Sequence, residues 1–164
     1  MVCFNNFCIS IPPSLSYQKM VTITGNGGGN MQVKLSDILE GMDFIGDDRG
    51  YFYRVKTGTV EMDDEDFFAD MEPAFDPETE DVIYLPSQWD INDRQIMFDF
   101  VDQLQDNKQI DLLLNRLHGH KPYRRFKDGV LELGIQDAWY AFQAATYRQI
   151  ALNWARENDL QVIE

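Results

Sequence analysis

The sharpest charge contrast in the chain lies in the segment 116–127, which could bind an anion. The segment holds no acidic residue and five of the fourteen bases: Arg116, Lys121, Arg124, Arg125 and Lys127. Pro122 suits the first turn of a helix, where free backbone N–H groups and the helix dipole attract negative charge. Tyr123 and Phe126 lie between the bases and could stack on a nucleobase. Alternatively, the bases offset acidic residues within the fold or are scattered over a helix surface.

The opposite charge is concentrated in the segment 61–81, which holds eleven acidic residues and no base. A calcium-binding loop needs glycine at its sixth position and glutamate at its twelfth. A loop starting at Asp76 would have Asp81 and Ser87 there, and one starting at Asp63 would have Phe68 at the glycine position. The spacing favours a solvated acidic loop, with weak binding of divalent ions as the alternative. We expect this loop to face the segment 116–127.

Other residues capable of chemistry give weaker indications. His118 and His120 are the only histidines of the chain, whereas a zinc site needs three or four ligands. A position at the end of a helix accounts for both histidines without a metal. The sequence contains no Gly-x-Ser-x-Gly motif, and its abundant carboxylates single out no catalytic pair. We therefore assign no catalytic residue, no metal ligand and no cofactor.

The elements that must position these groups follow from the pattern of apolar residues. Aromatic and β-branched runs on either side of Thr57-Gly58 predict a hairpin over 51–62, and 82–85 predicts a third strand. The segment 160–163 is a further strand candidate. We predict an α+β fold in which four to five helices pack on this small antiparallel sheet.

Helices are predicted where apolar residues recur at intervals of three and four. Ser36 and Asp90 are the expected N-caps of the first two helices. The expected helices cover 36–44, 90–105, about 110–118, about 126–133 and 137–158, of which the last is the longest. Trp139 and Trp154 lie about four turns apart on the longest helix, so we expect both in the core, with a partner-binding aromatic patch as the alternative.

Length and charge bound the class of protein. The chain has 164 residues, of which 44% are hydrophobic and 13% aromatic, enough for one well-filled core. No apolar run is long enough to span a membrane. The formal net charge of -14 repels nucleic acids and anionic lipid surfaces, so we expect neither as a partner.

Residues 1–30 differ in composition from the rest. They contain no acidic residue, a single base and both cysteines, Cys3 and Cys8, and they end in the glycine-rich run 25–30. No base precedes the apolar start, which argues against a secretion signal. We expect a flexible N-terminal extension, consistent with a misassigned start, followed by one domain over 31–164. That domain lacks cysteine, which is typical of a reducing compartment, so we expect a cytoplasmic protein.

Two runs carry a resemblance to a known family: Arg-Arg-Phe-Lys-Asp at 124–128 and Trp-Tyr-x-Phe at 139–142. Further matching positions are Leu35, Ser36, Ile38, the hairpin 53–60, the run 85–87, Arg94, Met97, Phe100 and Trp154. From Met31 onward the chain resembles a bacterial group, the uncharacterised protein family 0158. The resemblance implies a bacterial cytoplasmic protein. The family has no established activity, so no catalytic residue is carried over.

These features together favour a non-enzymatic binding or interaction module. Its partner would be an unidentified protein or a small anionic ligand, and the sequence carries no signal for an oligomeric state. The alternative is an enzyme that acts on a phosphorylated or nucleotide-like small molecule through the segment 116–127.

Overall fold

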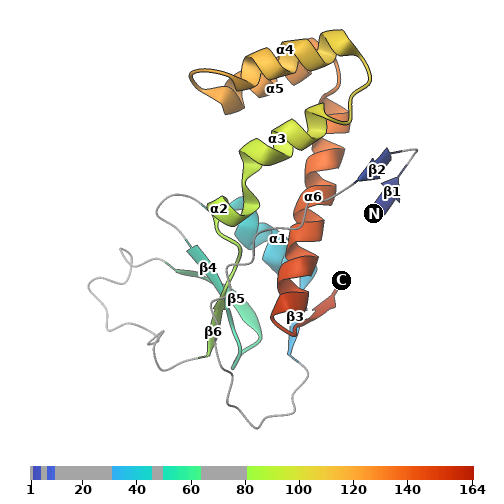
Figure 1. Ribbon diagram of the computed structural model, residues 1–164. Coiled ribbons are helices and arrows are strands. Elements are labelled where there is room, and N and C mark those ends of the chain that lie inside the picture. Colours follow the sequence, from blue (N-terminus) through green and yellow to red (C-terminus); the bar gives the residue numbers. More distant parts are fainter. Residues whose placement is uncertain (1, 5–6, 10–30, 46–49, 64–80) are drawn as a thin grey trace.

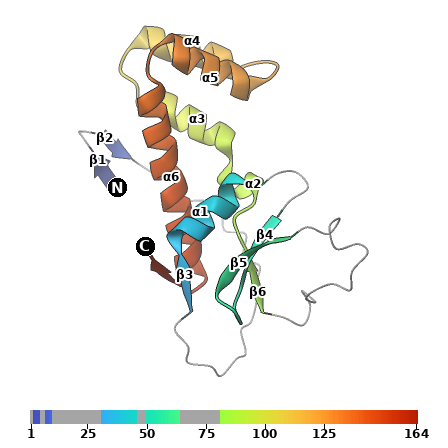
Figure 2. The same ribbon diagram turned by 180° about the vertical axis from the view of Figure 1, so that it is seen from behind.

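The computed structural model in Figure 1 describes residues 2–4, 7–9, 31–45, 50–63 and 81–164. Its strands are β1 (Val2–Phe4), β2 (Phe7–Ile9), β3 (Gln32–Lys34), β4 (Gly50–Arg54), β5 (Thr59–Asp63), β6 (Val82–Tyr84) and β7 (Gln161–Ile163). Its helices are α1 (Leu35–Asp43), α2 (Gln88–Ile91), α3 (Asp93–Val101), α4 (Asn107–Leu117), α5 (Pro122–Glu132) and α6 (Gln136–Glu157). Figures 1 and 2 show α6 running along the molecule, with α4 and α5 at one end and strands β4 to β6 toward the other. The predicted α+β class is confirmed.

The antiparallel sheet has the strand order β5-β4-β6. Tyr53 in β4 pairs with Val60 of β5 on one side and with Ile83 of β6 on the other. Gly58 closes the hairpin with a φ of 72°, a conformation that glycine adopts without steric cost. The predicted hairpin and third strand are therefore confirmed.

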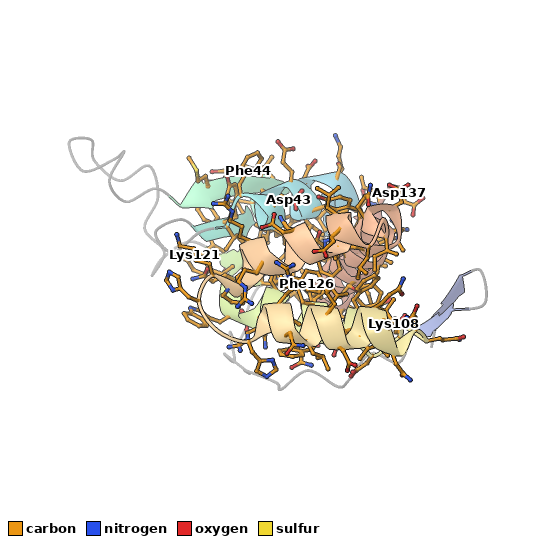
Figure 3. All side chains as sticks on the ribbon, turned by 90° about the horizontal axis from the view of Figure 1, so that it is seen from above. Asp43, Phe44, Lys108, Lys121, Phe126 and Asp137 are labelled. Carbon is orange, nitrogen blue, oxygen red and sulfur yellow. The ribbon has the colours of Figure 1, made fainter. Side chains whose placement is uncertain are left out.

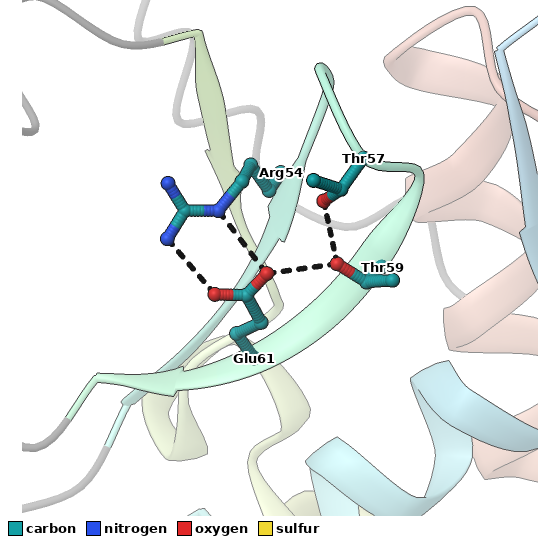
Figure 4. Close-up of polar contacts among 4 residues, drawn as sticks. All are labelled: Arg54, Thr57, Thr59 and Glu61. Atoms are coloured by element: carbon teal, nitrogen blue, oxygen red, sulfur yellow. Dashed lines mark hydrogen bonds and ion pairs between the residues drawn. The ribbon is translucent and has the colours of Figure 1, made fainter. Parts of the chain in front are cut away.

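A cross-strand ion pair stabilises the hairpin, as Figure 4 shows. Arg54 donates from Nε to Glu61 Oε1 at 3.1 Å and from Nη2 to Glu61 Oε2 at 2.9 Å. The hydroxyl of Thr59 donates to the same carboxylate at 2.8 Å. Hydrogen bonding by Arg54 holds the pKa of Glu61 below its usual value. Two parallel N–H bonds fix the pair in one geometry, which a single lysine contact would not do.

Strand β7 forms where a strand was expected, but it does not join the antiparallel sheet. It pairs in parallel with β3, and Gln161 N–H donates to the Met31 carbonyl at 2.8 Å. The reason lies in the packing of α1 against α6. Strand β3 leads into α1 and β7 follows α6, so the two strands meet beside this helix pair. The Tyr53 hydroxyl donates to the Gln32 carbonyl at 3.1 Å and links β4 to β3.

The first helix begins one residue earlier than predicted, and Ser36 is not its N-cap. Lys34 occupies the cap position without a side-chain hydrogen bond, and the Ser36 hydroxyl donates to Asp37 instead. Because β3 runs directly into α1, no loop residue is available to cap the helix. Ile38 and Met42 face the core on this helix.

The single helix predicted over 90–105 is in fact two helices. Ser87 caps α2 in a reciprocal capping box with Asp90, so Asp90 lies inside the first turn rather than at the cap. Asn92 then adopts a left-handed conformation, ends α2 and caps α3 by accepting from the Gln95 N–H. Two overlapping cap signals thus break the continuous apolar pattern.

Aromatic side chains fill the core between α3, α5 and α6. The ring centroid of Trp139 lies 4.9 Å from that of Phe126 and 5.3 Å from that of Phe100, in edge-to-face arrangements. Trp154 lies near the other end of α6, where its Nε1 donates to the Tyr84 carbonyl at 2.9 Å and joins the helix to the sheet. Trp139 is 1% exposed and Trp154 8%, which confirms both as core residues.

Candidate functional site

The basic segment 116–127 lies on a hairpin of two helices, α4 and α5. Leu113 and Leu117 of α4 and Phe126 and Val130 of α5 are all buried. Gly129 permits the close approach of the two helices, because a Cβ there would lie 3.0 Å from a Leu113 methyl group. The two helices therefore pack closely against each other, and this packing fixes the position of the segment that carries the bases.

Two of the five bases are engaged within the hairpin. Arg125 donates from Nη1 to the His118 carbonyl at 2.6 Å and from Nη2 to the Asn115 carbonyl at 3.2 Å. These carbonyls end α4, so Arg125 satisfies backbone acceptors that would otherwise need water. Arg116 pairs with Glu132 at 2.8 Å across the two helices. Both arginine side chains therefore stabilise the α4–α5 hairpin.

The other three bases, Lys121, Arg124 and Lys127, are exposed, and their side chains make no hydrogen bond or ion pair with the described residues. Arg124 and Lys127 share one side of α5 with Leu131, which is 65% exposed. Lys121 precedes the helix in a left-handed conformation. We call Lys121, Arg124, Lys127 and Leu131 the basic face. Figure 3 shows Lys121 and Lys108 at opposite ends of the α4–α5 hairpin.

The two aromatic residues of this segment have different roles. Phe126 is fully buried, so it cannot stack on a ligand. Tyr123 is 46% exposed. Burial raises the pKa of Tyr123, and the Asp93 carboxylate adds to this effect while Arg94 opposes it. Of these two aromatic residues, only Tyr123 therefore has a ring accessible to a ligand.

Sequence reasoning missed a polar contact between α3 and α6. The Tyr147 hydroxyl donates to Asp93 Oδ1 at 2.6 Å, and burial together with this carboxylate raises the pKa of Tyr147 far above its usual value. The two residues lie 54 positions apart, so no local pattern could have indicated the pair. The bond ties the first turn of α3 to the middle of α6.

The histidines lie at the end of α4, as expected. His118 is the C-cap residue, with its Nδ1 2.6 Å from the Leu114 carbonyl, and its ring meets Phe98 edge to face. Gly119 follows with a φ of 100°, which suits glycine after a helix. Among the described residues, no group of three or more His, Cys, Asp or Glu side chains is placed to hold a metal ion.

The acidic segment 61–81 falls mostly outside the described residues. The expectation that it faces the basic segment therefore stays a prediction. Where the structure describes its ends, Glu61 is paired with Arg54 and Asp81 accepts from the Val55 N–H at 3.0 Å through its carbonyl. The expected extension 1–30 is described only in β1 and β2, which pair antiparallel.

A cleft that the sequence did not predict lies between α1 and the β4–β5 hairpin. Its volume is about 340 Å³, and its lining residues are Asp37, Glu40, Gly41, Phe44, Tyr51 and Val60. Two carboxylates stand on one side of an otherwise mostly apolar lining. We call these six residues the acidic cleft. The spacing 37, 40, 41 and 44 places four of them on one helix side, but Gly41 and Phe44 gave no signal of a cleft without the neighbouring strands.

Comparison with known proteins gives a family but no activity. Residues 30–164 match the uncharacterised protein family UPF0158, which confirms the resemblance seen in the sequence. A UPF0158 protein of Pseudomonas aeruginosa is 34% identical over 68 residues, covering 40% of this chain and 44% of that protein. The match therefore covers less than half of the length of that relative. No solved structure matches the chain. Among the described residues, no helix is long and apolar enough to cross a membrane.

Proposed function

We propose that this chain, which belongs to the uncharacterised protein family UPF0158, is a non-enzymatic interaction module whose basic face binds an acidic segment of a partner protein. The observation that carries this proposal is the state of the bases on the α4–α5 hairpin. Lys121, Arg124 and Lys127 are exposed without a partner among the described residues, whereas Arg116 and Arg125 are engaged in the hairpin.

The spacing of the face favours an extended partner over a single small anion. Lys121 and Lys127, the two outermost bases of the face, are six positions apart, which corresponds to about 9 Å along the helix. One phosphate or carboxylate reaches donors at only ~3 Å, so it could not engage the whole face. An extended peptide advances ~3.3 Å per residue and can place an acid near each base and an apolar side chain on Leu131.

The same charges argue against a nucleic acid as the partner. Duplex DNA carries one charge per ~1.7 Å, and tight non-specific binding needs many phosphate contacts. Three bases supply few such contacts, and the formal net charge of -14 on the whole chain repels the rest of the polymer. We also propose a cytoplasmic location, because the cysteine-free region 31–164 suits a reducing compartment.

The test is fluorescence anisotropy with a labelled peptide that alternates Glu with Leu and Ser, together with DNA and RNA oligonucleotides. Binding should weaken from about 50 mM to about 200 mM salt, because the contacts are ionic. The double variant Arg124→Glu with Lys127→Glu should lose at least about tenfold in affinity, or ~1.4 kcal/mol. The matched control for each single variant, Arg124→Glu or Lys127→Glu, is Lys108→Glu, which makes the same charge change at an exposed position at the far end of α4 and should bind like the unchanged chain.

Two outcomes would contradict the proposal. Equal loss in the Lys108→Glu control would show that bulk charge, not the basic face, governs binding. Saturable thermal stabilisation by ADP or inorganic phosphate that depends on Arg124, without peptide binding, would favour the alternative of an enzyme for phosphorylated small molecules. Circular dichroism melts of each variant establish that the fold is intact.

A further inference from the structure

The acidic cleft is built by one side of helix α1 against the β4–β5 hairpin. Asp37, Glu40 and Phe44 follow one another at helical spacing, so they line the same side of α1. Ile38 and Met42 occupy a different side, which is buried in the core. Helix α1 thus packs on the core with one side and lines the cleft with the other.

Close packing at Gly41 sets the shape of the cleft. A Cβ at this position would lie 2.7 Å from a Leu85 methyl carbon and 3.4 Å from the Tyr51 ring. The helix therefore approaches the strands as closely as a backbone without a side chain allows. Tyr51 and Val60 form the strand side of the cleft, and Phe44 stands at its edge with 61% of its side chain exposed.

The carboxylates of the cleft are available to a ligand. Glu40 is exposed, and its side chain makes no hydrogen bond or ion pair with the described residues. Asp37 accepts a hydrogen bond from the neighbouring Ser36 hydroxyl at 3.0 Å, which leaves capacity on its second oxygen. A cation placed here would gain two acidic partners and the faces of aromatic rings, which also attract cations.

We propose that the acidic cleft binds a basic segment of a partner protein, in which a lysine or arginine stem lies on Phe44 and Tyr51 and its charged head meets Glu40 and Asp37. Long basic side chains combine an apolar stem with a cationic head, and the cleft offers these two environments side by side. Its volume of about 340 Å³ is at the small end for ligand pockets and suits single side chains of a peptide.

Charge complementarity extends beyond the cleft itself. The chain carries a formal net charge of -14, which attracts a cationic segment from a distance and speeds its association. The cleft lies between α1 and the β4–β5 hairpin. The basic face belongs to α5 and the residue before it, and Figures 1 and 2 show α4 and α5 at the other end of α6. The inference therefore does not depend on the proposed function, and either could fail without the other.

The experiment measures binding of a labelled peptide that alternates Lys with Leu, by fluorescence anisotropy with the full chain. A peptide alternating Lys with Ser tests the apolar part of the cleft. Glu40→Lys should weaken binding of the Lys-Leu peptide by at least about tenfold. Its matched control is Asp111→Lys, which makes the same charge change at an exposed position of α4 whose side chain has no hydrogen bond or ion pair among the described residues.

A second pair of variants tests the aromatic contribution. Phe44→Ala should weaken binding of the Lys-Leu peptide severalfold, whereas Tyr140→Ala, which removes another exposed ring, should leave it unchanged. Equal losses for Glu40→Lys and Asp111→Lys would overturn the proposal, because they would indicate general charge attraction. Full binding by Phe44→Ala would also overturn it. Spermidine that binds as tightly as the peptide, with the same dependence on Glu40, would assign the cleft to a small polyamine instead.

Discussion

The packing around Trp139 makes a strong prediction about stability. This side chain is 1% exposed and lies where α3, α5 and α6 meet, in contact with the rings of Phe100, Phe126 and Phe142. Replacing it with alanine removes this contact area and leaves a cavity that surrounding helices fill only in part. Large-to-small changes of this kind cost about 3–5 kcal/mol in free energy of unfolding.

The neighbouring rings place Trp139→Ala at the upper end of that range, since edge-to-face aromatic pairs contribute about 0.5–1.5 kcal/mol beyond buried area. Domains of this size have about 5–15 kcal/mol of stability in total. With ~2–4 °C lost per kcal/mol in a chain of this length, the melting temperature should fall by roughly 10–20 °C.

Trp139→Phe should behave differently. The indole Nε1 is buried and has no hydrogen-bond partner among the described residues, and a buried unpaired donor costs about 1–3 kcal/mol. Phenylalanine removes that donor and keeps one ring in place. The lost contact area and the removed penalty therefore offset each other, and we expect a change below ~2 kcal/mol.

Urea denaturation followed by far-ultraviolet circular dichroism measures these differences. Trp89→Ala is the matched control, because Trp89 is 82% exposed and its loss should change stability by less than ~0.5 kcal/mol. The reasoning is refuted if Trp139→Ala costs less than ~1 kcal/mol, or if Trp139→Phe destabilises the protein as much as Trp139→Ala.

Three further changes have expected outcomes. Arg125→Ala should cost about 1–3 kcal/mol, because it leaves the carbonyls at the end of α4 without their charged donor, and thermal melts that match the unchanged chain would contradict this role. The lowered pKa of Glu61 means that its contribution to stability is present above the unfolded-state pKa and is lost as pH falls through the folded-state value. Glu61→Gln should therefore flatten the decline in urea stability between about pH 5 and pH 3, and an unchanged slope would exclude the pair with Arg54 as its cause. Deleting residues 1–30 should leave the melting temperature within about 2 °C, since we expect this segment to be an extension outside the core, and a fall of ~10 °C would show that it packs on the domain.

Local patterns predicted several elements with their approximate ends. The hairpin around Gly58 and the helix α6 follow from residue type and spacing over neighbouring positions, and both formed as predicted. The division into α2 and α3 was missed because Asn92 reads as an ordinary polar residue within an apolar repeat. Only its left-handed backbone reveals it as the end of one helix and the cap of the next.

The candidate site was predictable as a segment but not as a surface. Charge composition identified all five bases of 116–127. It could not predict that Arg125 bonds to the end of α4 while its neighbour Arg124 points outward. The two differ by 100° around the helix, which turns one toward the end of α4 and the other outward. The acidic cleft gave no signal in the sequence because its lining comes from α1 and two strands that meet only in the fold.

By itself, the sequence predicted the separation of acidic and basic segments, the hairpin, the long helix and the burial of Trp139 and Trp154, because each prediction rests on composition or on the spacing of residue types along the chain. The tertiary structure alone decided which bases of 116–127 lack a partner among the described residues and how β3 meets β7. Gln32 and Gln161 lie side by side although 129 positions separate them. Such contacts depend on the path of the whole backbone, which local spacing does not encode.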